Sequence, residues 1–320
     1  MSLALRIIAS TEIARAICLG DFFRAPEPEK ARILWNAGIH DAGVQFYTTD
    51  ARLDRASAEN VARKNAGTGS RAFAFGPCPE EKSGPPSTTS STSARSWMAF
   101  FQAPAELKFR GDRFEIPGGD ACANFVVRSV TVTGPSQSVG RAADGSWKIP
   151  PQDGLVTVTC SHDRAGSPDA ARQGPELWYS VPSGKGPAPM NPVPGSLFAW
   201  INEARKLENL HPLSPVRLRH APDLSKAQTS LHDRKKLREI AALARNQQKL
   251  SLVGEDRVIA RSTEDAAWLL WNSPRHRDLL LSKDARSIMV QETKNKPDDK
   301  RQGTITSSLL MFSPCATCKR

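Results

Sequence analysis

Hydrophobic and polar positions repeat with different periods in three parts of the chain. From residue 197 onward, apolar residues recur three and four positions apart, which is the period of an amphipathic helix. The pattern predicts a mixed domain over 197–313, followed by a short tail at 314–320. Its expected elements are helices at 197–207, 221–231, 234–246 and 263–271, then closing strands at 287–290 and 304–312 around a polar insertion at 294–302.

The region 97–181 has the shorter period of β-strands. Runs rich in β-branched residues, at 129–133 and 155–159, are separated by turn signals such as Asp144-Gly145. Short strands at this spacing predict a β-sandwich of immunoglobulin-like type. Cys122 precedes one strand and Cys160 ends another, so they are candidates for a disulfide between sheets; a reducing compartment would leave both as buried thiols.

The remaining segments complete a multidomain α+β fold class. The region 1–81 shows helical patterns and no catalytic spacing, which predicts a small, mainly helical region. The segment 82–96 is rich in Ser, Thr and Pro, and 182–196 is rich in Pro and Gly. Neither has the apolar residues needed to offset its ordering entropy, so both are expected to be linkers.

Composition narrows the class without naming a function. Hydrophobic residues make up 39% and charged residues 24% of the 320 residues, as in soluble globular proteins. The net charge of +11 raises the possibility of a nucleic-acid or anionic-surface partner. The cations are spread along the chain, however, and the densest run, 234–238, is interleaved with apolar residues as in an amphipathic helix. We therefore favour a solvated helix face and expect no nucleic-acid partner.

The sequence gives mixed signals about compartment. No stretch is long and apolar enough for a membrane span, and charges interrupt the segment 3–19 where a signal sequence would be uncharged. Either the protein is made without an export signal or the signal lies upstream of the given start. The six cysteines permit three disulfides in an oxidising compartment. Cys315 and Cys318 have CxxC spacing at the C-terminus, which favours a frayed tail or a local disulfide over a redox centre.

Five short motifs follow one another in the last third of the chain. They are Asn202-Glu203-Ala204-Arg205, Leu210-His211-Pro212-Leu213, His232, Gly254-Glu255-Asp256 and Ser273-Pro274-Arg275-His276-Arg277-Asp278-Leu279-Leu280. In this order they resemble the signature of the CAP superfamily, the family of the cysteine-rich secretory proteins. The resemblance covers 197–313 and implies an α-β-α sandwich there.

The resemblance also implies a cleft lined by histidines and acidic residues, which zinc occupies in some members. By position these residues are His232, Glu255 and His276, with Glu264 as a weak stand-in for a second family glutamate. Two imidazoles and a carboxylate suit Zn²⁺, so His232 and His276 are candidate metal ligands. Asp256 and Arg275 replace the usual Asn and Gly, which puts metal capture in doubt.

Each candidate also has a purely structural interpretation. His232 could pair with Asp233 at a helix end, His276 could pin the turn after a helix, and Glu255 could accept backbone amides. Trp268 and Trp271 lie three apart, which favours a core contact over a ligand platform.

Three functions are compatible with these observations. The resemblance favours a non-catalytic, extracytoplasmic binding protein whose cleft takes a metal or an unknown protein, lipid or cell-surface ligand. A hydrolase in which His276 or Glu255 activates water is the alternative, although no GxSxG or HExxH motif supports it. The third is binding of nucleic acid or anionic surfaces through positive charge, which predicts a steep salt dependence.

Overall fold

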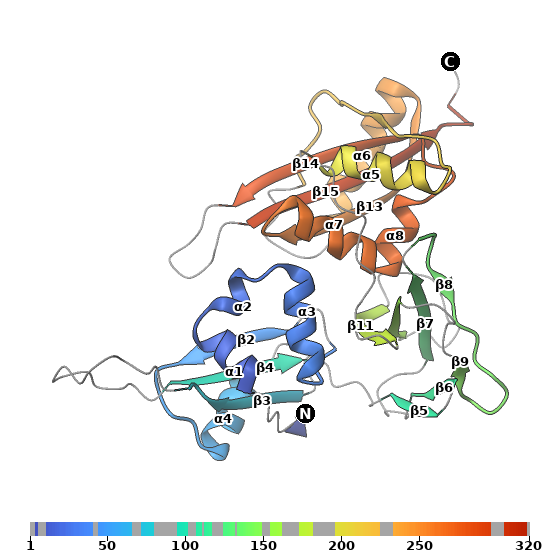
Figure 1. The fold of residues 1–320 in the computed structure, drawn as a ribbon. Helices are drawn as coiled ribbons and strands as arrows, with labels where there is room; N and C mark the ends of the chain where they lie inside the picture. The colour runs from blue at the N-terminus through green and yellow to red at the C-terminus, as the bar shows by residue number, and fades with distance from the viewer. Residues whose placement is uncertain are drawn as a thin grey trace. The chain divides into compact units, whose positions relative to one another are not determined.

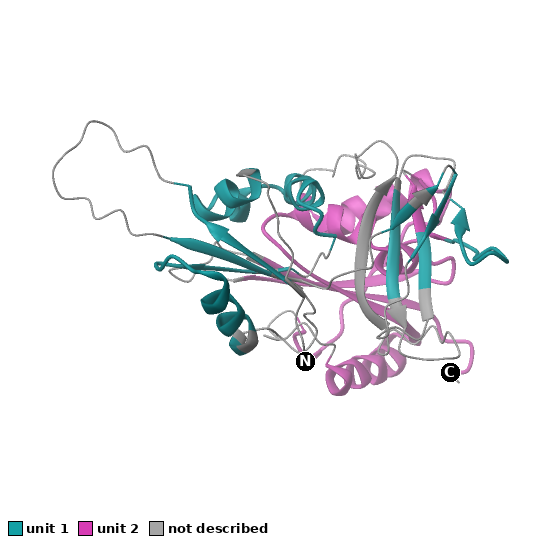
Figure 2. Cartoon of the chain, turned by 90° about the horizontal axis from the view of Figure 1, so that it is seen from below, with its two compact units in different colours: residues 1–128, 138–151, 155–185 teal, residues 129–137, 152–154, 186–320 magenta. Residues whose placement is uncertain are grey.

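The structure is a computed structural model of all 320 residues. The residues that it describes are 4–5, 11–40, 44–65, 72–79, 95–101, 107–110, 112–116, 124–131, 133–148, 154–161, 173–181, 196–224, 233–295 and 304–318. The chain forms two compact units, which Figure 2 distinguishes by colour. Unit 1 comprises 1–128, 138–151 and 155–185; unit 2 comprises 129–137, 152–154 and 186–320. The two linkers predicted at 82–96 and 182–196 lie almost wholly outside the described residues.

The N-terminal part of unit 1 combines helices with a sheet. The helices are α1 (Thr11–Cys18), α2 (Asp21–Arg24), α3 (Glu27–Asn36) and α4 (Arg55–Asn65). The strands β1 (Ala4–Leu5), β2 (Gln45–Thr49), β3 (Ala72–Pro77) and β4 (Ser96–Phe101) form one sheet in the order β1-β3-β4-β2 (Figure 1). The prediction of a mainly helical region omitted this sheet, and β4 lies beyond the proposed linker. The strands of this sheet were missed because each is short and pairs with a strand distant in sequence.

The region 107–181, most of which belongs to unit 1, is built from strands, as its period predicts. The strands are β5 (Lys108–Arg110), β6 (Arg113–Glu115), β7 (Asn124–Thr131), β8 (Gln137–Ser138), β9 (Trp147–Lys148), β10 (Gly154–Ser161) and β11 (Gln173–Val181). They form a three-stranded sheet, β5-β6-β9, and a four-stranded sheet, β11-β10-β7-β8. Phe114 and Trp147 of the first sheet share a core with Val127 and Val156 of the second. The immunoglobulin-like topology stays a prediction.

Unit 2 contains a sheet with helices on both faces (Figure 1). The strands β12 (Ser214–Pro215), β13 (Leu250–Ala260), β14 (Ser287–Asn295) and β15 (Thr304–Pro314) run in the order β12-β14-β15-β13. The helices are α5 (Leu197–Leu207), α6 (Arg234–Gln248), α7 (Thr263–Asn272) and α8 (Pro274–Leu280). No helix in the described part of the chain is both long and apolar enough to cross a membrane.

Alternation along β15 separates the two layers of unit 2. Leu309 and Met311 pack with α5, α7 and α8, whereas Leu310 and Phe312 pack with α6. Trp271 of α7 is buried in the first of these cores and meets Trp200 edge to face at 6.0 Å between ring centroids. The prediction that Trp268 and Trp271 are core residues is confirmed, since each is 4% exposed.

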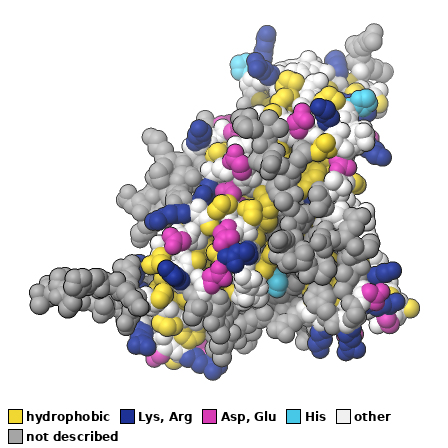
Figure 3. All heavy atoms as spheres, in the orientation of Figure 1, with side chains coloured by type: hydrophobic (Ala, Val, Ile, Leu, Met, Phe, Trp, Pro, Cys, Tyr) yellow, Lys and Arg dark blue, Asp and Glu magenta, His cyan; other side chains and the backbone are white. Residues whose placement is uncertain are grey.

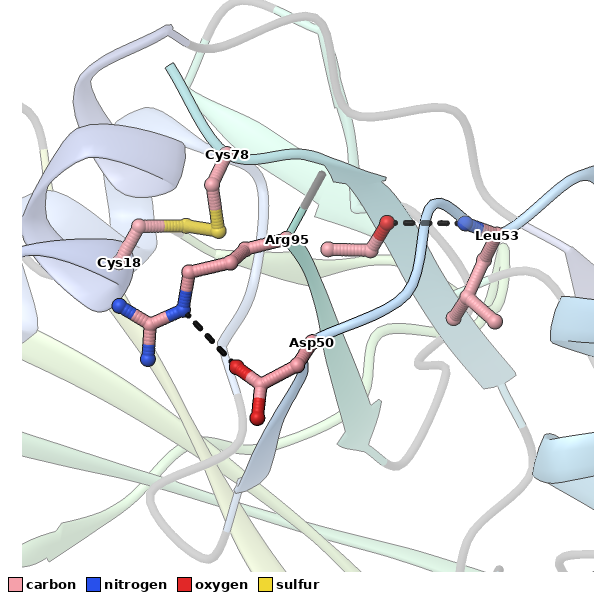
Figure 4. The surroundings of a disulfide bond; sticks show 6 residues. Cys18, Asp50, Leu53, Cys78 and Arg95 are labelled. Atoms are coloured by element: carbon pink, nitrogen blue, oxygen red, sulfur yellow. Dashed lines mark hydrogen bonds and ion pairs between the residues drawn. A yellow bond between two sulfur atoms is a disulfide. The ribbon is translucent and has the colours of Figure 1, made fainter. Parts of the chain in front are cut away.

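Two cysteine pairs lie at disulfide distance in the described residues. Cys18, at the end of α1, bonds Cys78, which follows β3 (Figure 4). Next to this bond, Arg95 forms an ion pair with Asp50 at 3.3 Å, and the Cys78 amide donates to the carbonyl of Arg95. The sequence analysis did not propose the Cys18–Cys78 pair. Cys315 bonds Cys318, in agreement with a local disulfide, and the Cys122 of the predicted Cys122–Cys160 pair lies outside the described residues.

Candidate functional site

The face of the unit 2 sheet that carries α6 becomes polar beyond the helix. Strand register sets Arg257, Ser308 and Gln291 side by side across β13, β15 and β14, and all three point to this face. The next row along the strands is Glu255, Leu310 and Met289. The Ser308 hydroxyl is fully buried and has no hydrogen-bond partner among the described residues. On this face of the sheet, the apolar residues Leu310 and Met289 are therefore followed by the polar row of Arg257, Ser308 and Gln291.

Gln291 anchors the chain that leads toward His232. Its side-chain amide donates to the carbonyl of Pro222 at 3.0 Å, and its oxygen accepts from the amide of Leu224 at 2.9 Å. After the segment 225–232, the chain resumes at Asp233, whose carboxylate caps α6 by accepting from the amide of Lys236 at 3.1 Å. That bond lowers the pKa of Asp233. His232 itself lies outside the described residues, but both ends of its segment belong to the α6 layer.

Glu255 points to the same face of the sheet as Gln291. Its backbone is paired with Leu310, so its half-buried side chain points to the side of the sheet that carries α6. Asp256, its neighbour, is buried on the opposite face and pairs with Leu309. The alternation of β13 explains why one acidic residue of the Gly-Glu-Asp motif is available at this face and the other is in the core.

His276 and Glu264 belong to the other layer. His276 is half-buried in α8, a helix that packs against β13 in the core of α5 and α7. Glu264 is exposed in the first turn of α7. The sheet therefore lies between α8 and the strand face of Glu255. The predicted cleft joining His232, Glu255 and His276 stays a prediction, as does the part of Glu264.

No group of three or more His, Cys, Asp or Glu in the described ranges is arranged to hold a metal ion. Those ranges do not include His232. The donor types of the predicted site, imidazole and carboxylate, suit zinc chemically, so zinc remains a proposal for the cleft.

The Asn-Glu-Ala-Arg motif has a structural role that the sequence analysis did not anticipate. Asn202 donates to the carbonyl of Leu213 at 3.2 Å and accepts from its amide at 2.7 Å. Arg205 is fully buried and donates to carbonyls at the ends of two other segments, namely those of His211, Leu280, Ser282 and Ala285. Burial lowers the pKa of Arg205. These two side chains fix the Leu-His-Pro-Leu turn and the end of α8 to α5.

Arg277 has a comparable role in α8. Its guanidinium lies 4.0 Å from the ring centroid of Trp271 and donates to that residue's carbonyl at 2.6 Å. It also donates to the carbonyls of Thr131 and Gly134, in the segment 129–137 of the same unit. Burial lowers the pKa of Arg277 to about 9, while the charges of Glu208 and Asp278 act in the opposite direction. Arg277 therefore remains a cation near neutral pH.

Acidic residues complete the binding of the segment 129–137. Glu208 accepts from the amide of Gly134 at 2.6 Å, and the carboxylate of Asp278 accepts from both the amide and the hydroxyl of Ser136. Arg277 and Asp278, two conspicuous residues of the last motif, therefore make structural bonds. No local spacing in the sequence indicated these partners, because the carbonyls of Thr131 and Gly134 are far from Arg277 along the chain.

Comparisons with known proteins give a resemblance to a solved structure but no match to a family model or a curated protein. A solved structure that resembles it is a cysteine-rich secretory protein from Staphylococcus aureus, with a TM-score of 0.27 and 14% sequence identity. That match covers 65% of this chain and 82% of the other.

Proposed function

We propose that residues 197–313 form a CAP-like domain in a non-catalytic binding protein. The observation that carries the proposal is that the motif residues explain the packing of a three-layer unit. Asn202 and Arg205 bond the turn and the helix end that follow them in the family's order. A chance series of motifs would have no reason to converge on one set of contacts.

The binding site that we propose lies on the α6 face of the sheet. Glu255 and the row Arg257–Ser308–Gln291 line it. We assign His232 to it because the described residues that flank its segment, Leu224 and Asp233, belong to the layer of α6. A carboxylate, a guanidinium and a hydroxyl offer both signs of charge and both hydrogen-bonding roles. This set suits a polar ligand or a metal held by His232 and Glu255. The chemistry does not name the ligand.

An extracytoplasmic location is part of the proposal. The bond between Cys18 and Cys78 joins residues 60 apart in sequence, and such structural disulfides persist in oxidising compartments. The predicted β-sandwich of 97–181 would then serve as a positioning or adhesive domain beside the CAP-like domain.

Metal binding by the full-length chain tests the cleft. We expect zinc to raise the thermal midpoint of the wild type, because a ligand at about 100 times its dissociation constant adds about 2.7 kcal/mol of stability. The variant His232→Ala combined with Glu255→Gln should lose this shift. His211→Ala removes an exposed histidine of the same unit and is the matched control.

The outcomes separate the candidate functions. Equal shifts in the wild type and the double variant would exclude His232 and Glu255 as ligands. Hydrolysis of ester or peptide substrates by the wild type that disappears in His232→Ala combined with His276→Ala would replace the binding proposal by the hydrolase alternative.

A further inference from the structure

The outer surface of α6 is strongly cationic. The helix contains five cationic residues and one acidic residue, and it buries Ile240 and Ala244 against the sheet. Arg234, Arg238 and Arg245 are exposed. Their spacing places them within an arc of about 40° on the helix and spreads them over about 16 Å. They form a row along the side of α6 that faces solvent.

The segment before α6 adds two exposed arginines near the C-terminal end of the helix. Val216 is buried in the α6 core and Leu218 packs against it, whereas the alternating Arg217 and Arg219 are exposed. Two glutamines of α6 hold this segment by its backbone. Gln247 bonds both the amide and the carbonyl of Arg219, and Gln248 donates to the carbonyl of Arg217 at 2.6 Å. The backbone of Arg217 and Arg219 is thus held in place, while their guanidinium groups remain exposed.

These five residues, Arg217, Arg219, Arg234, Arg238 and Arg245, are here termed the α6 arginine row. None of them forms an ion pair with a residue in the described part of the chain. By contrast, Arg32 of unit 1 is neutralised by Glu12 and Glu29. On the face seen in Figure 3, blue cationic and magenta acidic side chains are likewise intermixed. Like charges left uncompensated on and beside one helix repel one another, and an anionic partner would relieve that repulsion.

Among the described residues, neither α6 nor 216–219 offers the row a large exposed apolar anchor. The large hydrophobic side chains that are exposed among the described residues are Phe23, Tyr47, Leu207, Val253 and Ile259, and none belongs to α6 or to 216–219. A partner must therefore be held by charge and not by insertion. Single-stranded nucleic acid usually stacks its bases on aromatic side chains, which this surface does not offer.

We propose that the α6 arginine row docks the protein on a bilayer containing anionic phospholipids. Clusters of four to eight cations on a helix are typical of such surfaces, and guanidinium groups match phosphate geometry. The Cys18–Cys78 bond points to an oxidising compartment, where lipid headgroups are accessible and nucleic acid is scarce. The proposal is independent of the cleft, because the row uses neither His232 nor Glu255.

Vesicle sedimentation with the full-length chain tests this docking. Vesicles of phosphatidylcholine alone are compared with vesicles that also contain phosphatidylglycerol. The test variant combines Arg234→Gln, Arg238→Gln and Arg245→Gln. The control variant combines Arg52→Gln, Lys64→Gln and Lys108→Gln, which removes the same charge from exposed positions of unit 1. Circular dichroism and thermal unfolding establish that both variants fold.

We expect the wild type to bind only the anionic vesicles, and to release as salt is raised. Each cation near such a surface strengthens binding roughly fivefold, so the test variant should bind about 100-fold more weakly. The control should stay within a few-fold of the wild type. Equal losses in the two variants would reduce the effect to net charge and overturn the proposal. It would also fail if the wild type ignored anionic vesicles or preferred duplex DNA to them at the same salt concentration.

Discussion

Two buried arginines determine how the segments of unit 2 are held together. A buried cation normally requires a carboxylate, yet Arg205 is satisfied by backbone carbonyls that converge from the turn after α5 and from the end of α8. Carbonyl dipoles oriented toward a guanidinium stabilise its charge and keep its planar geometry fixed. The residue therefore satisfies the carbonyls of two segments that would otherwise carry unsatisfied backbone groups.

Replacing Arg205 should consequently be severe. In Arg205→Met the side chain keeps much of its volume, but the carbonyls of Leu280 and Ala285 remain buried without donors. Because each unsatisfied buried group costs about 1–3 kcal/mol, we expect a loss of roughly 3 kcal/mol or more in the free energy of unfolding of unit 2. Urea denaturation provides the measurement.

Two companion variants make this test specific. Arg205→Lys retains the charge but cannot reproduce the planar fork, so its loss should be intermediate. Lys206→Met changes an exposed cation on the same helix and should stay close to the wild type. A loss below about 1 kcal/mol for Arg205→Met would show that water or rearrangement satisfies the carbonyls.

At the scale of elements, Gly254 shows how closely α8 approaches β13. A Cβ atom built on Gly254 would lie 2.9 Å from Cδ1 and 3.0 Å from Cδ2 of Leu279. The glycine of the Gly-Glu-Asp motif is therefore explained by the contact of a strand with a helix, at the point where the β13–β15 register shifts.

This contact yields a prediction in the form of a double-mutant cycle. Gly254→Val should destabilise unit 2 by about 1–3 kcal/mol, because it overpacks the site occupied by Leu279. Leu279→Ala should also destabilise it, by leaving a gap. The combination should cost clearly less than the sum of the two, as measured by chemical denaturation. Strictly additive losses would place the strain of Gly254→Val elsewhere than at Leu279.

The elements that the sequence predicted well are those with strong local periodicity. The helix expected at 197–207 is α5, the helix at 263–271 is α7 to within one residue, and both closing strands are present. By contrast, β13 and α8 were not predicted as elements. The alternation of β13 is irregular in burial because a bulge interrupts it, and α8 is only 7 residues long. The pairing of β13 with β15 and the packing of α8 against α7 and β13 join residues that are distant in sequence or in separate elements. A short stretch of sequence does not contain this information.

The candidate site shows the same limit at the level of side chains. The motifs identified which residues are special, but not whether a residue contacts a ligand or the fold. Glu255 points to the α6 face because of its register with Leu310. Arg277, which is equally conspicuous in the next motif, instead donates its hydrogen bonds to backbone carbonyls. Register and the convergence of carbonyls are properties of the folded chain, so spacing alone could not separate these roles.

At the scale of the whole molecule, the two described disulfides differ in what they constrain. Cys18 and Cys78 are separated by 60 residues, and the loop that they close includes α2, α3, α4 and two strands of the N-terminal sheet. Cys315 and Cys318 are separated by 3 residues and close a turn after β15. The chain-entropy model assigns a larger stabilisation to the longer loop, since the unfolded state loses more freedom when its distant parts are joined.

Of the two described disulfides, Cys18–Cys78 should therefore contribute more to the stability of unit 1 than Cys315–Cys318 contributes to that of unit 2. We expect Cys18→Ser combined with Cys78→Ser to lower the free energy of unfolding of unit 1 by about 4 kcal/mol, and Cys315→Ser combined with Cys318→Ser to cost unit 2 at most about 2 kcal/mol. Calorimetry of the full-length chain should resolve this as a downward shift of one transition while the other stays in place. A parallel shift of both transitions in the Cys18–Cys78 variant would mean that the two units unfold as one cooperative body. An unchanged thermogram would mean that the reduced loop is already as constrained as the oxidised one, and the entropic account of this bond would be wrong.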